Sequence, residues 1–184
     1  MGSTVAYMVA DGSEPLEVVA PIDVLRRGGV DVVTVSVTGS IDVLLAQDLR
    51  LTADALVQDV NLFDGFDMVV VPGGSEGVKA MAACEALTKD LTARMREDRL
   101  VAAICAAPTI LADLGLLEGR RAVCYPGCQD GFPDGAYQAG ISVCVDGSLI
   151  TATGPGTALP FGKMLLHILE GEKKAEEVAA SMLF

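Results

Sequence analysis

The thiol of Cys105 is the group in this sequence best placed to act as a nucleophile. The apolar run at residues 100–104 predicts a buried strand that ends directly before it, and Ala106-Ala107-Pro108 predicts a helix start directly after it. These small neighbours leave room for a sharp turn that presents the sulfur to solvent. The free N–H groups and positive dipole end of the helix favour a thiolate, so we expect a lowered pKa. A buried, inert thiol is the alternative.

Two glycine-rich segments also follow predicted strands. These are Val71-Pro72-Gly73-Gly74 and Thr153-Gly154-Pro155-Gly156-Thr157. If the strands are parallel, both loops emerge at the edge of the sheet that carries Cys105. Glycine lets backbone approach closely, so the amides of Gly74 and Ala106 could bind the oxyanion formed when the thiol attacks a carbonyl. Glycine pairs also occur as plain turns, which is the alternative here.

The elements that must position these groups alternate between strand and helix along all 184 residues. Strands are expected at residues 5–9, 31–37, 66–71, 100–104, 122–125, 141–145 and 149–152, and helices at 15–27, 76–97 in two pieces, 106–114, 158–169 and 173–183. Residues 41–56 predict a short hairpin or excursion, and Asp146-Gly147 predicts a hairpin turn. We therefore expect a single α/β domain over residues 1–184, with a doubly wound, mostly parallel sheet between helices.

The first predicted helix contains a proline, Pro21. Proline has no N–H, so the carbonyl of Glu17 loses its helical partner and the turn that carries Glu17 should be distorted. On its local context alone, Glu17 would be a solvated helix glutamate.

Composition and charge exclude several other functions. The formal charge is −12, which disfavours a nucleic-acid surface. The five cysteines show no zinc-finger or zinc-ribbon spacing, so we expect no metal, and we interpret Cys124 and Cys128 as structural thiols. The sequence contains no glycine-rich loop with a lysine that would bind a phosphate-bearing cofactor, so we expect no cofactor. The chain shows neither a signal-peptide pattern nor an apolar stretch of about 18 residues, so we expect a soluble, cytoplasmic protein with no membrane contact.

Taken together, these loops resemble the ThiJ/PfpI superfamily over nearly the whole chain, in the branch of the parkinsonism-associated protein deglycase and bacterial covalent chaperones. The segments that carry the resemblance are Val101-Ala102-Ala103-Ile104-Cys105-Ala106-Ala107-Pro108-Thr109, Val71-Pro72-Gly73-Gly74, Gly154-Pro155-Gly156-Thr157, and Gly12-Ser13-Glu14 with Glu17, Pro21, Asp23 and Arg26-Arg27-Gly28-Gly29. The resemblance implies a flavodoxin-like, class I glutamine amidotransferase-like fold and a homodimer. It also implies that Cys105 is the nucleophile and that Glu17, protonated beside it, exchanges protons with it.

The sequence departs from the family pattern in its histidines. Tyr125 stands before Pro126, where the best-known human member has a histidine, and Ala106 stands where the peptidase branch places one. The only histidine, His167, lies inside a predicted helix, and we interpret it as a packed or surface residue. A complete Cys-His-acid triad and proteolysis are therefore disfavoured. The pocket is expected to be lined by Gly73, Tyr125, Pro126, Gly154 and Pro155.

Three functions remain open on these residues. The first is a glyoxalase- or deglycase-type enzyme that acts on reactive carbonyls, such as methylglyoxal or its adducts, through Cys105 and Glu17. The second is a redox sensor or stress chaperone in which Cys105 is oxidised, with little turnover, and glycated or oxidised proteins are partners. The third is an inert binding module. The missing histidine weakens the first more than the second.

Overall fold

The central sheet has seven strands in the order β5-β2-β1-β6-β7-β9-β8. A computed structural model describes residues 2–184 of the chain. The sheet strands are β1 (Thr4–Val9), β2 (Asp31–Ser36), β5 (Ala55–Leu56), β6 (Met68–Val71), β7 (Leu100–Ile104), β8 (Val143–Asp146) and β9 (Leu149–Ala152). All neighbouring strands are parallel except β8, which pairs antiparallel with β9 through the hairpin predicted at Asp146-Gly147. The prediction of a mostly parallel sheet is confirmed.

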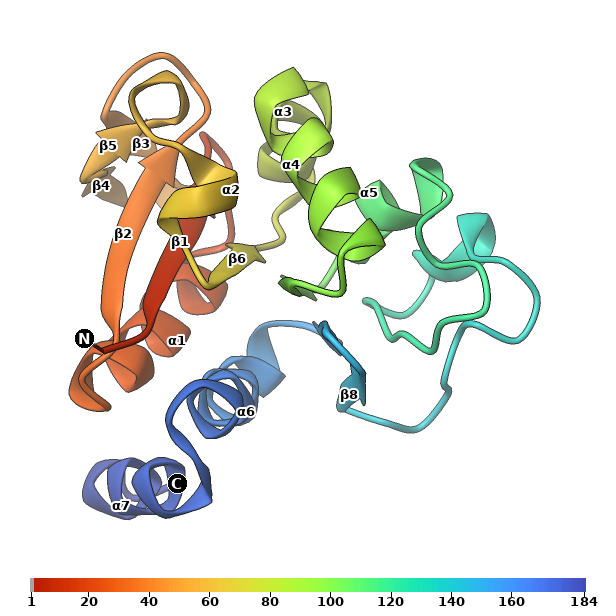
Figure 1. The fold of residues 1–184 in the computed structure, drawn as a ribbon. Coiled ribbons are helices and arrows are strands. Elements are labelled where there is room, and N and C mark those ends of the chain that lie inside the picture. Colours follow the sequence, from red (N-terminus) through yellow and green to blue (C-terminus); the bar gives the residue numbers. More distant parts are fainter. Residues whose placement is uncertain (1) are drawn as a thin grey trace.

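Helices cover both faces of this sheet, as Figure 1 shows. One face packs against α1 (Pro15–Arg27), α6 (Ala158–Glu170) and α7 (Glu172–Met182), and the other against α2 (Leu62–Gly65), α3 (Ser75–Ala83), α4 (Glu85–Arg96) and α5 (Pro108–Asp113). Each layer contributes its own hydrophobic cluster, because β1, β6 and β7 are buried on both sides and alternate their side chains between the two. The predicted doubly wound architecture is confirmed.

The excursion predicted at residues 41–56 is a small hairpin. β3 (Asp42–Leu44) pairs antiparallel with β4 (Arg50–Thr52) in a separate two-stranded sheet. The short 3-10 turns of the chain are η1 (Ala46–Asp48), η2 (Val57–Asp59), η3 (Gln129–Gly131) and η4 (Pro155–Thr157). The hairpin sits next to the start of α1, since the Leu44 carbonyl accepts a hydrogen bond of 2.8 Å from Gly12 N–H.

Two local predictions were wrong. Residues 122–125 do not form a strand; Ala122 makes an isolated bridge to Tyr137, while the Val123 N–H donates to the Thr151 hydroxyl at 2.9 Å. The N–H groups of Ala122 and Tyr125 donate to the carbonyls of Ala136 and Cys105, so the segment forms no continuous strand ladder. The helix predicted from residue 106 begins at Pro108 instead. Ala106 and Ala107 are left in the turn, where their N–H groups precede the helix.

The parallel arrangement brings the loops after β6, β7 and β9 to one edge of the sheet. β6, β7 and β9 pair in register, so Val71, Ala103 and Thr151 lie abreast near their carboxyl ends. Beyond this level come Gly73-Gly74, Cys105 and Gly154. The fold therefore delivers the three glycine- or cysteine-bearing loops to one place, as expected for a ligand site in an open α/β sheet.

Candidate functional site

Cys105 stands at a strained turn between β7 and α5. Its φ angle is +66°, in the left-handed region that residues other than glycine seldom adopt. The backbone is fixed from two sides: its N–H donates to the Ala152 carbonyl at 2.9 Å, and its carbonyl accepts from Tyr125 N–H at 2.8 Å. Such a conformation costs of order 1–3 kcal/mol and persists only where neighbours enforce it. The structure thus has the sharp turn that the sequence predicts.

Gly73 lies between the cysteine and the glutamate. Its N–H donates to Oε2 of Glu17 at 2.8 Å. A Cβ atom at Gly73 would lie 2.5 Å from Cβ of Cys105 and 2.6 Å from Oε2 of Glu17. Real Cβ atoms do not approach so closely, so glycine at this position is what allows the two functional side chains to meet.

The backbone amides of Gly74 and Ala106 both face the sulfur of Cys105. Each favours the thiolate and so acts to lower the pKa of Cys105. Gly74 has a φ of +94°, and a Cβ there would lie 2.2 Å from the Gly12 carbonyl oxygen, so the loop needs glycine to take this path. These are the two amides that the sequence proposes for an oxyanion, and the structure brings both to the thiol.

Glu17 reaches the site from α1. It is fully buried; Oε2 is held by Gly73, while Oε1 has no nitrogen or oxygen partner within residues 2–184. The carboxyl lies beside the Cys105 thiol, close enough for each group to shift the pKa of the other. The glutamate is therefore not the solvated helix residue that its local sequence suggests.

The carboxyl and the thiol shift each other's pKa in opposite directions: Glu17 raises that of Cys105, and Cys105 lowers that of Glu17. Burial raises the pKa of Glu17 to about 7, against the lowering effects of Cys105 and the Gly73 N–H. Burial, followed by the charge and hydrogen bond of Glu17, raises the pKa of Cys105 to about 12. The expected lowering of the cysteine pKa was therefore wrong: the helix-start amides do favour the thiolate, but desolvation and the carboxylate outweigh them. The two groups titrate as a coupled pair.

The thiol is half-buried and opens into a cavity of about 550 Å³. Of the predicted pocket residues, Tyr125 and Pro155 line this cavity, whereas Pro126 and Gly154 line a neighbouring hollow of about 420 Å³ that shares the same two residues. The prediction of Gly73 as a lining residue was wrong, because it packs between Cys105 and Glu17 instead. Sequence reasoning missed several residues of the cavity wall, which are Glu14, Ser75, Val78, Thr109 and Cys128. Periodicity could not reveal them, since they come from four separate segments.

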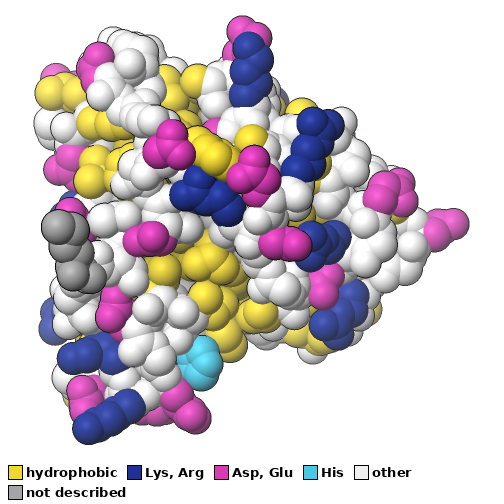
Figure 2. Space-filling model, in the orientation of Figure 1, with side chains coloured by type: hydrophobic (Ala, Val, Ile, Leu, Met, Phe, Trp, Pro, Cys, Tyr) yellow, Lys and Arg dark blue, Asp and Glu magenta, His cyan; other side chains and the backbone are white. Residues whose placement is uncertain are grey.

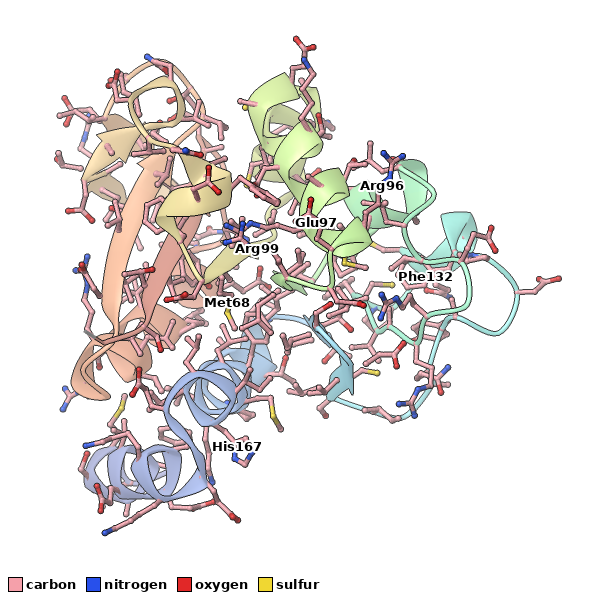
Figure 3. The ribbon with its side chains drawn as sticks, in the orientation of Figure 1. Met68, Arg96, Glu97, Arg99, Phe132 and His167 are labelled. Carbon is pink, nitrogen blue, oxygen red and sulfur yellow. The ribbon has the colours of Figure 1, made fainter. Side chains whose placement is uncertain are left out.

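Tyr125 forms the wall between the two hollows. Its side chain is 49% exposed, and its ring packs on Gly154, where a Cβ would lie 3.1 Å from Cδ2 of the tyrosine. Tyr125 occupies the position before Pro126 where the family resemblance implies a histidine. His167 does not compensate, because it is exposed in the last turn of α6, at the surface in Figure 2 and directed outward in Figure 3. No histidine therefore reaches the thiol.

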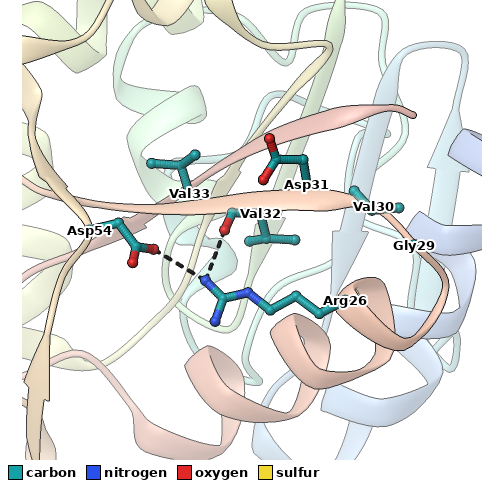
Figure 4. Close-up of a pocket in the computed structure, with 7 residues that line it drawn as sticks. All are labelled: Arg26, Gly29, Val30, Asp31, Val32, Val33 and Asp54. Carbon is teal, nitrogen blue, oxygen red and sulfur yellow. Dashed lines mark hydrogen bonds and ion pairs between the residues drawn. The ribbon is translucent and has the colours of Figure 1, made fainter. Parts of the chain in front are cut away.

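Other hollows lack comparable chemistry. The one in Figure 4 lies beside β2, where Arg26 donates to the Val32 carbonyl at 2.8 Å and pairs with Asp54 at 3.1 Å. Both charged side chains are about half exposed and already paired. Within residues 2–184, no cluster of three or more histidine, cysteine or acidic side chains could hold a metal ion. The Cys105 cavity is the candidate active site.

A family model described as DJ-1/PfpI matches residues 3–168. The chain belongs to the DJ-1/PfpI family. Among curated DJ-1 proteins, it is 38% identical over 176 residues to protein DJ-1 homolog B of Arabidopsis thaliana, covering 95% of this chain and 40% of that protein. It is 30% identical to the glutathione-independent glyoxalase DJR-1.2 of Caenorhabditis elegans, covering 96% and 93% of the two chains.

The solved DJ-1 structures show the same fold. Oxidized DJ-1 of Toxoplasma gondii superposes with a TM-score of 0.94 at 35% identity, covering 100% of this chain and 99% of that one. The chain spans less than half the length of the plant relative, whereas it covers nearly all of the nematode and Toxoplasma proteins. This chain therefore matches nearly all of the DJ-1 fold in the Toxoplasma structure.

Proposed function

We propose that this DJ-1 family member acts on small reactive carbonyl compounds, with Cys105 as nucleophile and Glu17 as proton acceptor and donor. The observation that supports it most is the meeting of a strained, cavity-facing thiol, a buried carboxyl and two free amides at one sheet edge. A related protein named as a glutathione-independent glyoxalase supports the substrate class. A cavity of about 550 Å³ accommodates a three-carbon dicarbonyl or its adducts.

The first step follows from the two raised pKa values. With its pKa raised to about 12, Cys105 is a thiol at neutral pH, while Glu17, at about 7, is there divided between its acid and its anion. As sulfur attacks the aldehyde carbon of methylglyoxal, the thiol proton passes to the Glu17 carboxylate and the carbonyl oxygen becomes an oxyanion. The amides of Gly74 and Ala106 stabilise this oxyanion until it accepts a proton and a hemithioacetal results.

The remaining steps are proton transfers and one hydrolysis. The carboxylate removes the proton from the former aldehyde carbon and returns it to the neighbouring carbon, while the hydroxyl proton passes to the oxygen of that neighbouring carbon. These transfers convert the hemithioacetal into a lactoyl thioester. One water then cleaves the carbon–sulfur bond and releases lactate and the free thiol. The net reaction adds one water to methylglyoxal and needs no redox partner. Tyr125 lines the cavity without taking part in these transfers.

A second function is favoured by the unpartnered oxygen of Glu17. If peroxide oxidises Cys105 to a sulfinate, the protonated carboxyl can donate a hydrogen bond to it, and its pKa of about 7 keeps a large protonated fraction at neutral pH. A DJ-1 relative solved in an oxidized form supports this chemistry. We therefore propose redox sensing, or a stress-chaperone role on glycated or oxidised proteins, as the alternative. Mass spectrometry after mild peroxide should find added oxygen mainly on Cys105, whereas equal oxidation of the five thiols contradicts it.

We also propose that the chain acts as a homodimer in the cytoplasm. Leu16 and Val19 on α1 are 58% and 54% exposed and border a hollow of about 460 Å³, which is an apolar surface that a second copy could cover. Sedimentation of the protein and of a Leu16→Glu variant tests the dimer, since a sedimenting monomer contradicts it. The five free thiols are in keeping with a reducing compartment. No helix within residues 2–184 has the length and apolarity needed to span a membrane.

Lactate formation from methylglyoxal by metal-free protein tests the main proposal. We expect Cys105→Ser to lower the rate at least a hundredfold, because oxygen replaces the attacking sulfur. Cys84→Ser is the matched control, since Cys84 is also a half-buried free thiol but lies outside the cavity, between α3 and α4. Equal rates for Cys105→Ser and the unmodified protein would remove the mechanism.

A further inference from the structure

The carbonyl of Glu17 is the weak point of the helix that carries the proposed acid. In an α-helix this carbonyl accepts from the N–H four residues later, and that residue is Pro21, which has none. Residue 17 is fully buried, so water cannot replace the missing donor. A buried carbonyl without a partner is costly, and the turn would be expected to shift until it finds one.

The donor comes from a different element. The hydroxyl of Tyr7, in the middle of β1 beneath α1, donates a hydrogen bond to the Glu17 carbonyl. Tyr7 is fully buried, so this bond is shielded from competing water. Burial, and then the charge of Glu17, raise the pKa of Tyr7 well above its usual value, so the phenol keeps the proton that it donates.

The turn is also held from the opposite side. A Cβ on Gly162 of α6 would lie only 2.8 Å from Cα of Pro21, so α6 packs directly on the backbone of α1 at the proline. Pro21 is therefore confined, and in the adjacent turn the carbonyl of Glu17 is held by the Tyr7 hydroxyl. The Glu17 carboxyl tolerates little displacement, because it must reach Cys105 past the backbone of Gly73.

We propose that Tyr7 is a positioning residue for Glu17: its hydroxyl replaces the helical donor that Pro21 lacks and so fixes the turn that aims the carboxyl at Cys105. The inference rests on the proposed pairing of Glu17 with Cys105 as the reactive centre. Tyr7 touches neither the sulfur cavity nor a substrate, and it acts through the backbone of Glu17.

The test must separate positioning from ordinary stabilisation. The rate of Cys105 alkylation by iodoacetamide, followed by mass spectrometry from pH 6 to 10, reports on the pair without any turnover. Apart from Cys105 itself, the titratable groups that face Glu17 are Glu14 at the start of α1 and Tyr7 on β1, and Cys128 lies across the cavity. None of the variants below alters Glu14 or Cys128.

Removing the hydroxyl should make the thiol more reactive. Glu17 raises the pKa of Cys105, so a carboxyl that drifts away relaxes this effect. We expect Tyr7→Phe to increase the alkylation rate at pH 8 at least threefold. Pro21→Ala restores an N–H for the Glu17 carbonyl, so in that background Tyr7→Phe should increase the rate by no more than about 1.5-fold. In a Glu17→Gln background, Tyr7→Phe should leave the rate unchanged, because the carboxylate is already gone.

A matched control removes a buried hydroxyl elsewhere. Thr34→Val deletes the hydroxyl that donates to Asp54 at 2.7 Å on β2, and it should lower the melting temperature without moving the alkylation profile. If Tyr7→Phe fails to fold, the Pro21→Ala background should restore folding, and failure in both backgrounds overturns the inference. If Tyr7→Phe changes the rate equally with and without the Pro21→Ala substitution, or changes it in neither background, the inference is overturned as well. Failure of the unmodified protein to form lactate would count against the proposed enzyme only. An unreactive Cys105 would contradict both the proposed enzyme and the positioning role of Tyr7.

Discussion

Two helices on opposite faces of the sheet each bury an acidic side chain, and the two acids differ in what surrounds them. Asp90 on α4 faces Arg94, whose Nε donates to it at 2.9 Å, and both side chains are almost completely buried. Glu17 on α1 faces a thiol and an amide and has no cation beside it. Burial raises the pKa of both acids, but only Asp90 is offset by a neighbouring positive charge.

The partners of Arg94 show what the first arrangement is for. Its guanidinium also donates to the carbonyls of Leu62, Phe63, Phe66 and Asp67, which lie in and after α2. Arg99, labelled in Figure 3, places its Cζ atom 4.2 Å from the centroid of the Phe63 ring and donates to the Phe66 carbonyl. The ion pair thus anchors the segment that leads into β6. An acid whose charge is neutralised serves the fold, while an unneutralised one beside a nucleophile is available for proton transfer.

The largest effect should come from breaking the ion pair between Asp90 and Arg94. Arg94→Ala leaves Asp90 buried without its cation and strips four carbonyls of a donor, so we expect a loss of about 3–5 kcal/mol in unfolding free energy. Urea denaturation measures it. The alkylation rate of Cys105 in the folded protein should stay within twofold of the unmodified value, and a larger change would show that the two regions are coupled.

The second effect concerns the unneutralised acid. The pKa of Glu17 is raised from 4.5 to about 7, so between these values the folded state keeps a proton that the unfolded state has lost. The stability contribution is fully present below pH 4.5 and is lost as the pH rises through about 7. This shift corresponds to about 3 kcal/mol. Glu17→Gln has no such proton to lose, so its unfolding free energy relative to the unmodified protein should rise across that window.

Urea denaturation at pH 4.5, 6 and 8 measures this difference, and lactate formation on the same variant measures the chemical role. We expect Glu17→Gln to be more stable than the unmodified protein at pH 8 and far slower with methylglyoxal. A stability difference that does not change with pH would mean that the glutamate titrates normally in the folded protein.

A third change acts on the glycine between the two reactive side chains. Gly73→Ala places a methyl group 2.5 Å from Cβ of Cys105 and 2.6 Å from Oε2 of Glu17, so one of them must move. Overpacking of this kind costs about 1–3 kcal/mol, measurable as a lowered melting temperature. It should also shift the pH profile of Cys105 alkylation, because the thiol and carboxyl separate. Gly156→Ala is the control, since a Cβ there meets open space.

The sequence predicts the scaffold well because its signals are local. The apolar runs at β6 and β7, the glycines that follow β6 and the Asp146-Gly147 turn each specify an element without reference to the rest of the chain. Order and parallel pairing then bring Cys105 and Gly74 together. The predicted thiolate failed because the cysteine pKa depends on how deeply the surrounding loops bury the sulfur, which no short motif records.

The hydrogen-bond donor of the Glu17 carbonyl is a second feature that the sequence predicts only in part. Pro21 reveals from sequence alone that the carbonyl lacks a helical donor. That the donor is Tyr7 depends on the alternation of β1, which places this residue on the face beneath α1, and on how the helix packs across the strand. One residue in the sequence reveals that a donor is missing, whereas only the three-dimensional structure reveals which side chain replaces it.

The smallest effect should come from an exposed acid on the helix that carries Glu17. Asp23 pairs with Arg27 at 3.0 Å, and their side chains are 46% and 51% exposed. Water already solvates both charges, so Asp23→Asn should change the unfolding free energy by no more than about 0.5 kcal/mol. Lactate formation and Cys105 alkylation should keep their rates. If this variant shifted the pH dependence of stability as much as Glu17→Gln does, burial would not be what separates the reactive acid from the others.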